Sequence, residues 1–134
     1  MDDTLHSNTD LQNSDMFFEK AVELGKLLDG HNGIDVVVMD MRPLNFWTDF
    51  FVIASVSSNT HLSGLERHIK NFVRENDLEI LHRSRKPEKD DEWCLLDLGS
   101  IVIHLMTTRV RGFFELERLW NSAPVIFNHS SKSS

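Results

Sequence analysis

Three aspartates lie in or beside short apolar runs rich in β-branched residues, and together they could perform metal-dependent chemistry. They are Asp40, Asp49 and Asp97. If the strands of one sheet bring them together, their carboxylates could hold two Mg²⁺ ions for nucleotidyl or phosphoryl transfer. Nucleotidyl transfer normally needs two carboxylates one residue apart on one strand beside a Gly-Ser turn, but here Arg42 stands where the second carboxylate belongs. A nucleotidyltransferase or phosphohydrolase is therefore the alternative function, with parts of its site missing.

The other residue types that commonly carry chemistry do not occur in the required patterns. The sequence contains neither a Gly-x-Gly-x-x-Gly nor a Walker pattern for binding phosphate, and no Gly-x-Ser-x-Gly elbow for a nucleophile. His61 and His68 share a helical face but are seven residues apart, farther than the one-turn spacing of helical metal ligands. The single cysteine, Cys94, excludes an internal disulfide and a thiolate metal cluster. We therefore predict that the protein is not an enzyme and holds neither a metal nor a cofactor.

The composition favours an acidic domain with a protein partner. The 134 residues include 21 acidic and 14 basic side chains, which gives a net charge of −7. Nucleic-acid binding depends on Lys and Arg that neutralise phosphates, so the lack of a basic stripe disfavours direct binding to RNA or DNA. A basic protein partner is electrostatically favourable instead. No apolar run approaches the about 20 residues of a membrane span, and no signal peptide is visible, so we expect a cytoplasmic protein without membrane contact.

The sequence divides into three parts. We expect a disordered acidic arm over residues 1–15, a single folded domain over 16–127 and a frayed tail over 128–134. Within the domain, helical spacing of apolar residues and runs of β-branched residues predict the elements. These are a helix over 15–30, strands over 35–41 and 49–55, a helix over 62–73, strands over 78–82, 93–97 and 101–105, and a helix over 112–120. The order α-β-β-α-β-β-β-α predicts an α/β (α+β layered) domain in which helices flank a mixed sheet.

Two further segments complete this prediction. The polar segment 84–92 should be an exposed loop. Residues 93–105 contain two short apolar runs joined by 98–100, which is typical of a β-hairpin. A single carboxylate, Asp97, ends the first run, and a single imidazole, His104, lies in the second. Because such groups are costly to bury without partners, they are either satisfied by neighbouring backbone or part of a binding site, and the sequence leaves both interpretations open.

Three segments give the chain a resemblance to a known family. They are 48–53 (Thr-Asp-Phe-Phe-Val-Ile), the hairpin residues 93–104, and 111–120 with its Phe-Glu-Leu-Glu-Arg-Leu-Trp run. In this order and spacing they resemble the ribosomal silencing factor family, also called Iojap, over residues 17–124. The resemblance implies a nucleotidyltransferase-like fold that lacks the catalytic carboxylate pair, and hence a protein without enzymatic activity.

The resemblance also implies a partner and a mechanism. It implies binding to the large ribosomal subunit through a basic ribosomal protein, universal large-subunit protein fourteen. Occupying that surface would block joining of the small subunit and lower translation under nutrient limitation. The resemblance further implies a homodimer.

The hairpin and the segment after it supply the candidate partner-binding residues. Trp93 and Leu98 match family positions that resemble docking anchors, although Trp93 could equally be a core residue at the start of a strand. Asp97 and Glu117 could meet Lys or Arg of the basic partner, or pair internally with Arg111. The full set of candidates is Trp93, Asp97, Leu98, Ser100, His104, Arg111 and Glu117.

Overall fold

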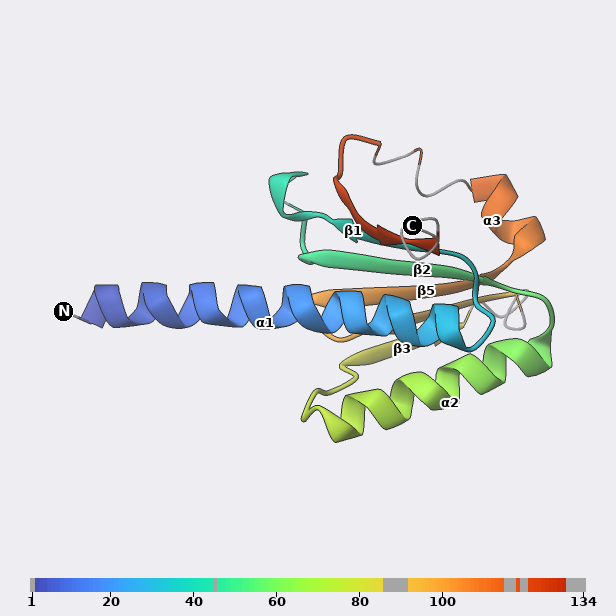
Figure 1. Ribbon diagram of the computed structural model, residues 1–134, viewed down its shortest axis with the longest axis horizontal. Coiled ribbons are helices and arrows are strands. Elements are labelled where there is room, and N and C mark those ends of the chain that lie inside the picture. Colours follow the sequence, from blue (N-terminus) through green and yellow to red (C-terminus); the bar gives the residue numbers. More distant parts are fainter. Residues whose placement is uncertain (1, 45, 86–91, 115–117, 119–120, 130–134) are drawn as a thin grey trace.

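The computed structural model describes residues 2–44, 46–85, 92–114, 118 and 121–129 (Figure 1). Its elements are helices α1 (Asp2–Gly30), α2 (Asn59–Glu75) and α3 (Thr108–Phe114), the 3-10 helix η1 (Arg42–Leu44), and strands β1 (Ile34–Asp40), β2 (Phe50–Val56), β3 (His82–Arg85), β4 (Trp93–Asp97), β5 (Ile101–Thr107) and β6 (Val125–Asn128). The six strands form one sheet in the order β3-β4-β5-β2-β1-β6. Strands β2 and β5 are parallel and the other neighbours are antiparallel. The predicted mixed α/β fold is confirmed.

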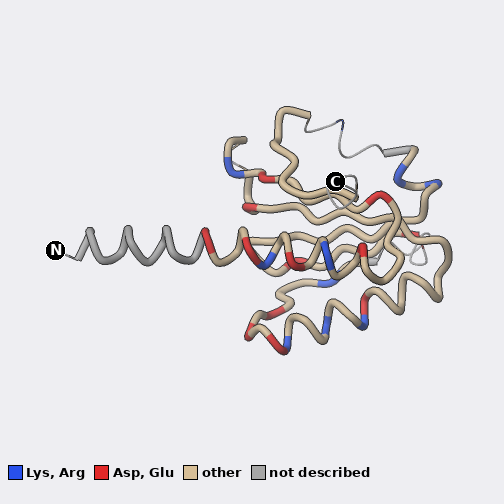
Figure 2. Tube along the Cα trace, viewed as in Figure 1, with Lys and Arg blue, Asp and Glu red and all other residues tan. Residues whose placement is uncertain are grey.

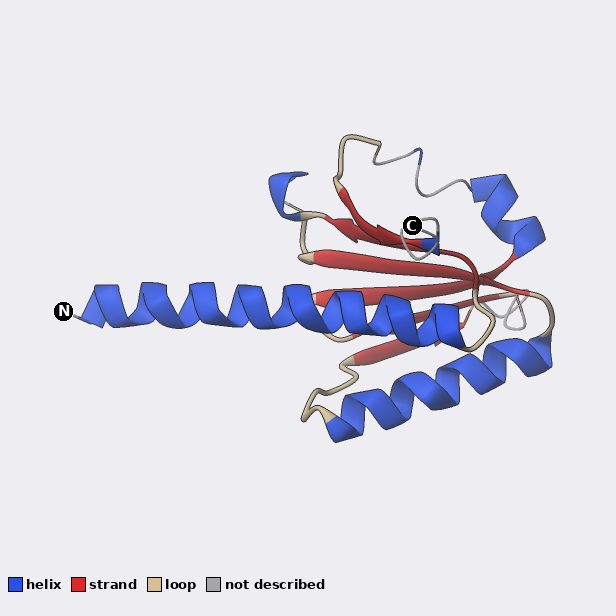
Figure 3. Cartoon of the chain, in the orientation of Figure 1, coloured by secondary structure: helices blue, strands red, loops and turns tan. Residues whose placement is uncertain are grey.

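Both faces of the sheet are covered, so its central strands are buried on two sides. Helices α1 and α2 lie across the first face (Figure 3). On β2, Phe50 and Val52 belong to the core beneath these helices, whereas Phe51 and Ile53 belong to a second core on the opposite, second face. Helix α3 contributes Val110 to that second core. This two-sided burial explains why every residue of β2 except Ser55 is apolar.

Helix α1 is longer than the sequence predicts. Its C-terminal half packs on the sheet through Ala21, Leu24 and Leu28, and it ends at Gly30. The helix begins at Asp2, so the segment 2–15, which we expect from the sequence to be a disordered arm, forms its N-terminal part (Figure 1). No Gly or Pro precedes Gly25 in the sequence. Once the packed half is helical, no helix-breaking residue therefore interrupts its extension toward the N-terminus.

Gly25 allows α1 to approach the sheet closely. A Cβ atom at this position would lie 2.5 Å from Cγ2 of Val38 and 3.0 Å from Cδ2 of Phe127. We expect Gly25→Ala to lower the free energy of unfolding by up to about 2 kcal/mol, because overpacking by the added methyl costs about 1–3 kcal/mol and the higher helix propensity of alanine offsets about 1 kcal/mol of this.

Gly64→Ala is the matched control for this prediction. Gly64 also lies inside a helix, α2, but a Cβ there would meet no atom within 4 Å. The change should therefore raise the free energy of unfolding by about 1 kcal/mol through helix propensity alone. Urea unfolding measures both variants, and a stabilised Gly25→Ala protein would contradict the close approach.

The two edge strands differ from the sequence prediction. Strand β3 covers His82–Arg85 rather than 78–82, because its backbone pairs with β4, with His82 opposite Asp97 and Arg85 opposite Cys94. Ser84 and Arg85 therefore lie in a strand and not in the expected loop, whose residues 86–91 lie outside the described part of the chain. Strand β6, which pairs with β1 at the other edge, is missing from the sequence prediction.

Helix α3 begins earlier than the sequence predicts. It starts at Thr108 rather than at residue 112. The hydroxyl of Thr107 accepts a hydrogen bond from the amide of Val110 at 3.3 Å and so caps the first turn. Residues 115–117 and 119–120, which we expect to continue this helix, lie outside the described residues.

Candidate partner-binding surface

The first and third residues of β4, Trp93 and Leu95, lie on the second face and are only partly covered. Their neighbours Cys94 and Leu96 point to the first face and are fully buried beneath the helices. Side chains alternate along a strand, so Asp97 shares the face of Trp93 and Leu95. One face of β4 therefore presents an indole, a leucine and a carboxylate along its length, with Trp93 opposite Met106 at one end of the strand and Asp97 opposite Val102 at the other.

His104 of β5 supports Trp93 from within the sheet. The indole Nε1–H of Trp93 donates to Nδ1 of His104 at 3.4 Å, and the two ring centres are 6.2 Å apart. The imidazole is 6% exposed, and its centre lies 4.9 Å from that of the Phe51 ring. Burial lowers the pKa of His104 to about 4, so the ring is neutral near pH 7. Because an indole N–H can only donate, its hydrogen bond to Nδ1 places the single imidazole proton on Nε2. We therefore assign His104 the role of positioning Trp93 rather than of contacting a partner.

Asp97 fixes the turn between β4 and β5. Its Oδ1 accepts a hydrogen bond from the amide of Gly99 at 2.8 Å, and Gly99 has a φ of +93°, which favours glycine. Asp97 and Ser100 remain partly exposed at this turn. Leu98 is only 7% exposed and packs in the first core. Its side chain thus supports the turn from the opposite side of the sheet and is not placed to contact a partner directly.

Arg111 stabilises the far end of the sheet. Its guanidinium donates to the backbone carbonyl of Ile34 at 3.2 Å and to the hydroxyl of Ser55 at 3.1 Å, and the residue is 9% exposed. Asp97 lies opposite Val102 at the start of β5, whereas Arg111 follows the end of this seven-residue strand. The two residues are therefore too far apart for the internal ion pair that the sequence left open. Glu117, the other candidate acid, lies outside the described residues.

The three aspartates of the alternative enzymatic site do not form a metal cluster. The carboxylate of Asp40 accepts from the backbone amide, Nε and Nη2 of Arg42 at 3.0, 2.9 and 2.7 Å. Burial alone would raise the pKa of Asp40, but the hydrogen bonds and charge of Arg42 outweigh it and hold this pKa below its usual value. Within the described ranges, no three His, Cys, Asp or Glu residues are placed to hold a metal ion. Asp40, Asp49 and Asp97 therefore do not supply the geometry that the alternative requires.

Comparison with known proteins identifies the family. The family described as Ribosomal silencing factor during starvation matches residues 14–134. The chain belongs to the ribosomal silencing factor family. The ribosomal silencing factor of Treponema pallidum (strain Nichols) is 35% identical over 91 residues, which cover 68% of this chain and 80% of that protein.

One further curated protein and one solved structure are also similar to this chain. The Mus musculus protein named Mitochondrial assembly of ribosomal large subunit protein 1 is 35% identical over 98 residues, which cover 72% of this chain and 43% of that protein. A crystal structure of a Chromobacterium violaceum protein has 26% sequence identity and a TM-score of 0.65, and the match covers 75% of this chain and 86% of that one.

The two histidines on one side of α2, His61 and His68, both contact His31. His68 stacks on His31 with ring centres 3.6 Å apart, and burial, followed by the charges of His31 and Arg67, lowers the pKa of His68. Nδ1 of His61 accepts from the backbone amide of Ser57 at 3.1 Å. As the spacing predicts, His61 and His68 share one side of α2.

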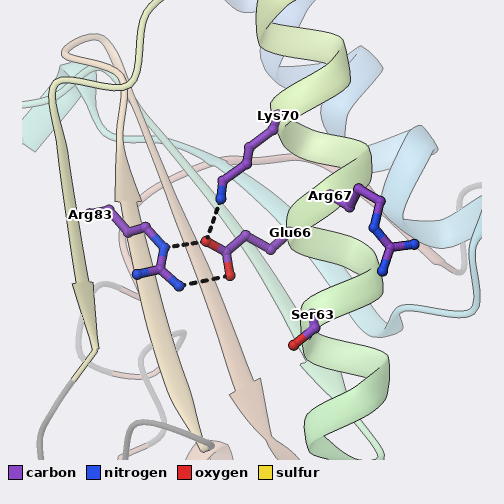
Figure 4. Close-up of a pocket in the computed structure, with 5 residues that line it drawn as sticks. All are labelled: Ser63, Glu66, Arg67, Lys70 and Arg83. Carbon is purple, nitrogen blue, oxygen red and sulfur yellow. Dashed lines mark hydrogen bonds and ion pairs between the residues drawn. The ribbon is translucent and has the colours of Figure 1, made fainter.

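An ion-pair cluster between α2 and β3 is absent from the sequence prediction. Glu66 of α2 is 4% exposed and pairs with Arg83 of β3, whose Nη2 lies 3.1 Å from Oε1. Lys70 is 3.5 Å from the other carboxylate oxygen. Figure 4 shows Lys70 and Arg83 directed at Glu66, whereas Arg67 points away from it. The cluster holds the polar edge strand β3 against α2. It could not be predicted from the sequence, because Glu66 and Arg83 meet only in the folded protein.

Acidic and basic side chains are mixed on the two long helices, α1 and α2. Figure 2 shows acidic and basic residues interspersed along the described part of α1 and along α2. No helix among the described residues is long and apolar enough to cross a membrane.

Proposed function

We propose that the protein binds the large ribosomal subunit and sterically blocks joining of the small subunit, which lowers translation under nutrient limitation. The observation that carries this proposal is the partly exposed Trp93, whose indole N–H is held by His104. Leu95 and Asp97 follow Trp93 along β4 on the same face of the sheet. A rigid, partly exposed indole is typical of a binding anchor, because it buries a large area at a small cost in side-chain entropy. The family assignment supports a ribosomal partner, and the mouse relative is named for assembly of the large subunit.

The proposed partner is a basic ribosomal protein, universal large-subunit protein fourteen. The proposed contact surface consists of Trp93, Leu95, Asp97 and Ser100, which are all partly exposed. The carboxylate of Asp97 complements a basic surface, and an interface of about 800 Å² on each partner would suffice. Glu117 as a contact residue, the homodimer and the cytoplasmic location stay predictions from the sequence.

Co-sedimentation tests the proposal. The purified protein is mixed with separated large and small ribosomal subunits and pelleted through a sucrose cushion. We expect the protein to pellet with the large subunit only. Pelleting with neither subunit, or with the small subunit alone, would refute the proposed function.

The charge of Asp97 and its role in the turn can be separated by two substitutions. Asp97→Asn keeps an oxygen that can accept from the Gly99 amide but removes the charge, whereas Asp97→Ala removes both. We expect Asp97→Asn to fold like the wild type, to bind the large subunit a few-fold more weakly and to show a weaker salt dependence of binding. Asp97→Ala should in addition lose about 1 kcal/mol of folding stability, because a hydrogen bond within the turn is lost.

Binding titrations at two salt concentrations and urea unfolding of both variants measure these effects. If Asp97→Asn binds as tightly as the wild type at both salt concentrations, the carboxylate does not contact the basic partner.

A further inference from the structure

A chain of aromatic contacts crosses the second face of the sheet and ends in an indole on each side. From Trp93 it runs through His104 to Phe51, with ring centres 6.2 and 4.9 Å apart. From Phe51 it continues to Phe46 at 5.4 Å, and from Phe46 to Trp47 at 5.7 Å. Contacting aromatic pairs of this kind are energetically favourable beyond the area that they bury. The two tryptophans therefore belong to one packed surface, although they lie far apart in the sequence.

Trp47 is far more exposed than the residues that connect it to Trp93. Its side chain is 61% exposed, whereas Phe51 is 2% and His104 is 6% exposed. The other large exposed apolar residues of the described chain are Met16, Leu81 and Val125, and none of them is aromatic. Tryptophan is enriched at protein interfaces and among the residues that contribute most to binding, so an exposed indole at the end of a packed aromatic row is typical of an interaction site.

The backbone that carries Trp47 is fixed to the same hairpin turn as the proposed contact surface. The buried hydroxyl of Thr48 donates to the carbonyl of Gly99 at 2.9 Å, and the amide of Asp49 donates to the carbonyl of Ser100 at 3.1 Å. The indole is thus attached to an ordered segment, so little conformational entropy is lost when a partner covers it. Asp49, two residues along the chain, is partly exposed, as is Asp97 across the turn.

We infer that Trp47 is a second anchor of the docking surface and contacts the same basic partner protein as Trp93. Four ring-to-ring steps of 4.9–6.2 Å connect the two indoles, so both fit within an ordinary interface of about 800 Å² per partner. A partner Arg or Lys can stack on the Trp47 indole while the carboxylates beside the turn balance its charge. This inference rests on the proposed function and adds a residue and a recognition chemistry to it.

The test is a binding titration of Trp47→Ala against the large subunit, beside the wild type, Trp93→Ala and Met16→Ala. Met16 is 39% exposed on α1, which packs on the opposite face of the sheet, so its variant controls for the loss of an exposed apolar side chain. We expect Trp47→Ala to bind about tenfold more weakly, Trp47→Phe to retain most of the affinity, and Met16→Ala to bind normally. Because the indole is exposed, thermal unfolding of Trp47→Ala should match that of the wild type.

Three results would overturn the inference. Wild-type affinity of Trp47→Ala, together with weakened binding of Trp93→Ala, would remove Trp47 from the surface and leave the proposed function standing. A change from dimer to monomer in Trp47→Ala by sedimentation velocity, at unchanged affinity for the subunit, would assign the indole to a contact between two copies of the chain. Failure of the wild type to bind the large subunit would remove the proposed function together with the inference.

Discussion

Replacing Trp93 by alanine is expected to weaken binding to the large ribosomal subunit by about 30-fold, or about 2 kcal/mol. The indole is the largest partly exposed group of the proposed contact surface, and its N–H is already held by His104, so it needs no reordering on binding. Trp93→Phe should lose less, because it keeps an aromatic ring beside His104 but removes the hydrogen bond. Co-sedimentation titrations of the three proteins measure the change in dissociation constant.

The fold of the variant must be checked separately, because Trp93 also packs against the second core. Circular dichroism and thermal unfolding show whether Trp93→Ala is folded at the temperature of the titration. Met16→Ala serves as the binding control. A folded Trp93→Ala protein with wild-type affinity would place the docking surface elsewhere on the molecule.

Acidification between pH 6.5 and pH 4 is expected to cost the protein about 3 kcal/mol of folding stability through His104 alone. Burial lowers the pKa of this imidazole from 6.5 to about 4 in the folded protein. As the pH falls through this window, the unfolded chain binds a proton and the folded protein does not, so the equilibrium shifts toward unfolding by about 1.4 kcal/mol per pH unit. The contribution is fully present above pH 6.5 and is lost by pH 4.

His104→Gln isolates this effect, since glutamine can accept from the Trp93 indole but does not titrate. Urea unfolding of both proteins at several pH values gives the two slopes. The stability of His104→Gln should fall less steeply than that of the wild type between pH 6.5 and pH 4. Parallel slopes in this range would mean that His104 is not the buried neutral group described here.

The central strands could be predicted from the sequence because their side chains are buried on both sides. Each of β1, β2 and β5 contains a run of consecutive apolar residues, at 36–39, 50–54 and 101–103, and the structure places these strands in adjacent positions at the centre of the sheet. The edge strand β3 has no comparable signal in the sequence. The residues of β3 are all polar, and β3 forms through backbone pairing with β4 and the contact of Arg83 with Glu66. Only tertiary contacts therefore define that edge.

The sequence names candidate residues for the partner-binding surface, but it does not tell which way their side chains point. The sequence singled out Trp93, Asp97 and His104, which the structure brings to one face of the sheet. It also selected Leu98, which packs on the opposite side, and Arg111, which is nearly buried and donates to Ile34 and Ser55 within the protein. A match to a family position, or the type of a residue, does not show whether its side chain points to the surface or into the protein.

Trp47 shows the converse case. Nothing in the sequence indicates that this tryptophan is exposed rather than buried. Only its exposure and its ring contact with Phe46 distinguish it.

Rejoining of separated ribosomal subunits is the measurement that tests the central claim most directly. Large subunits are incubated with the protein, small subunits are added, and the fraction of joined ribosomes is read from a sucrose gradient. We predict that the wild type suppresses joining in proportion to the large subunits it occupies, and that Trp93→Ala requires a correspondingly higher concentration. Normal joining of large subunits that are saturated with the wild-type protein would contradict the account.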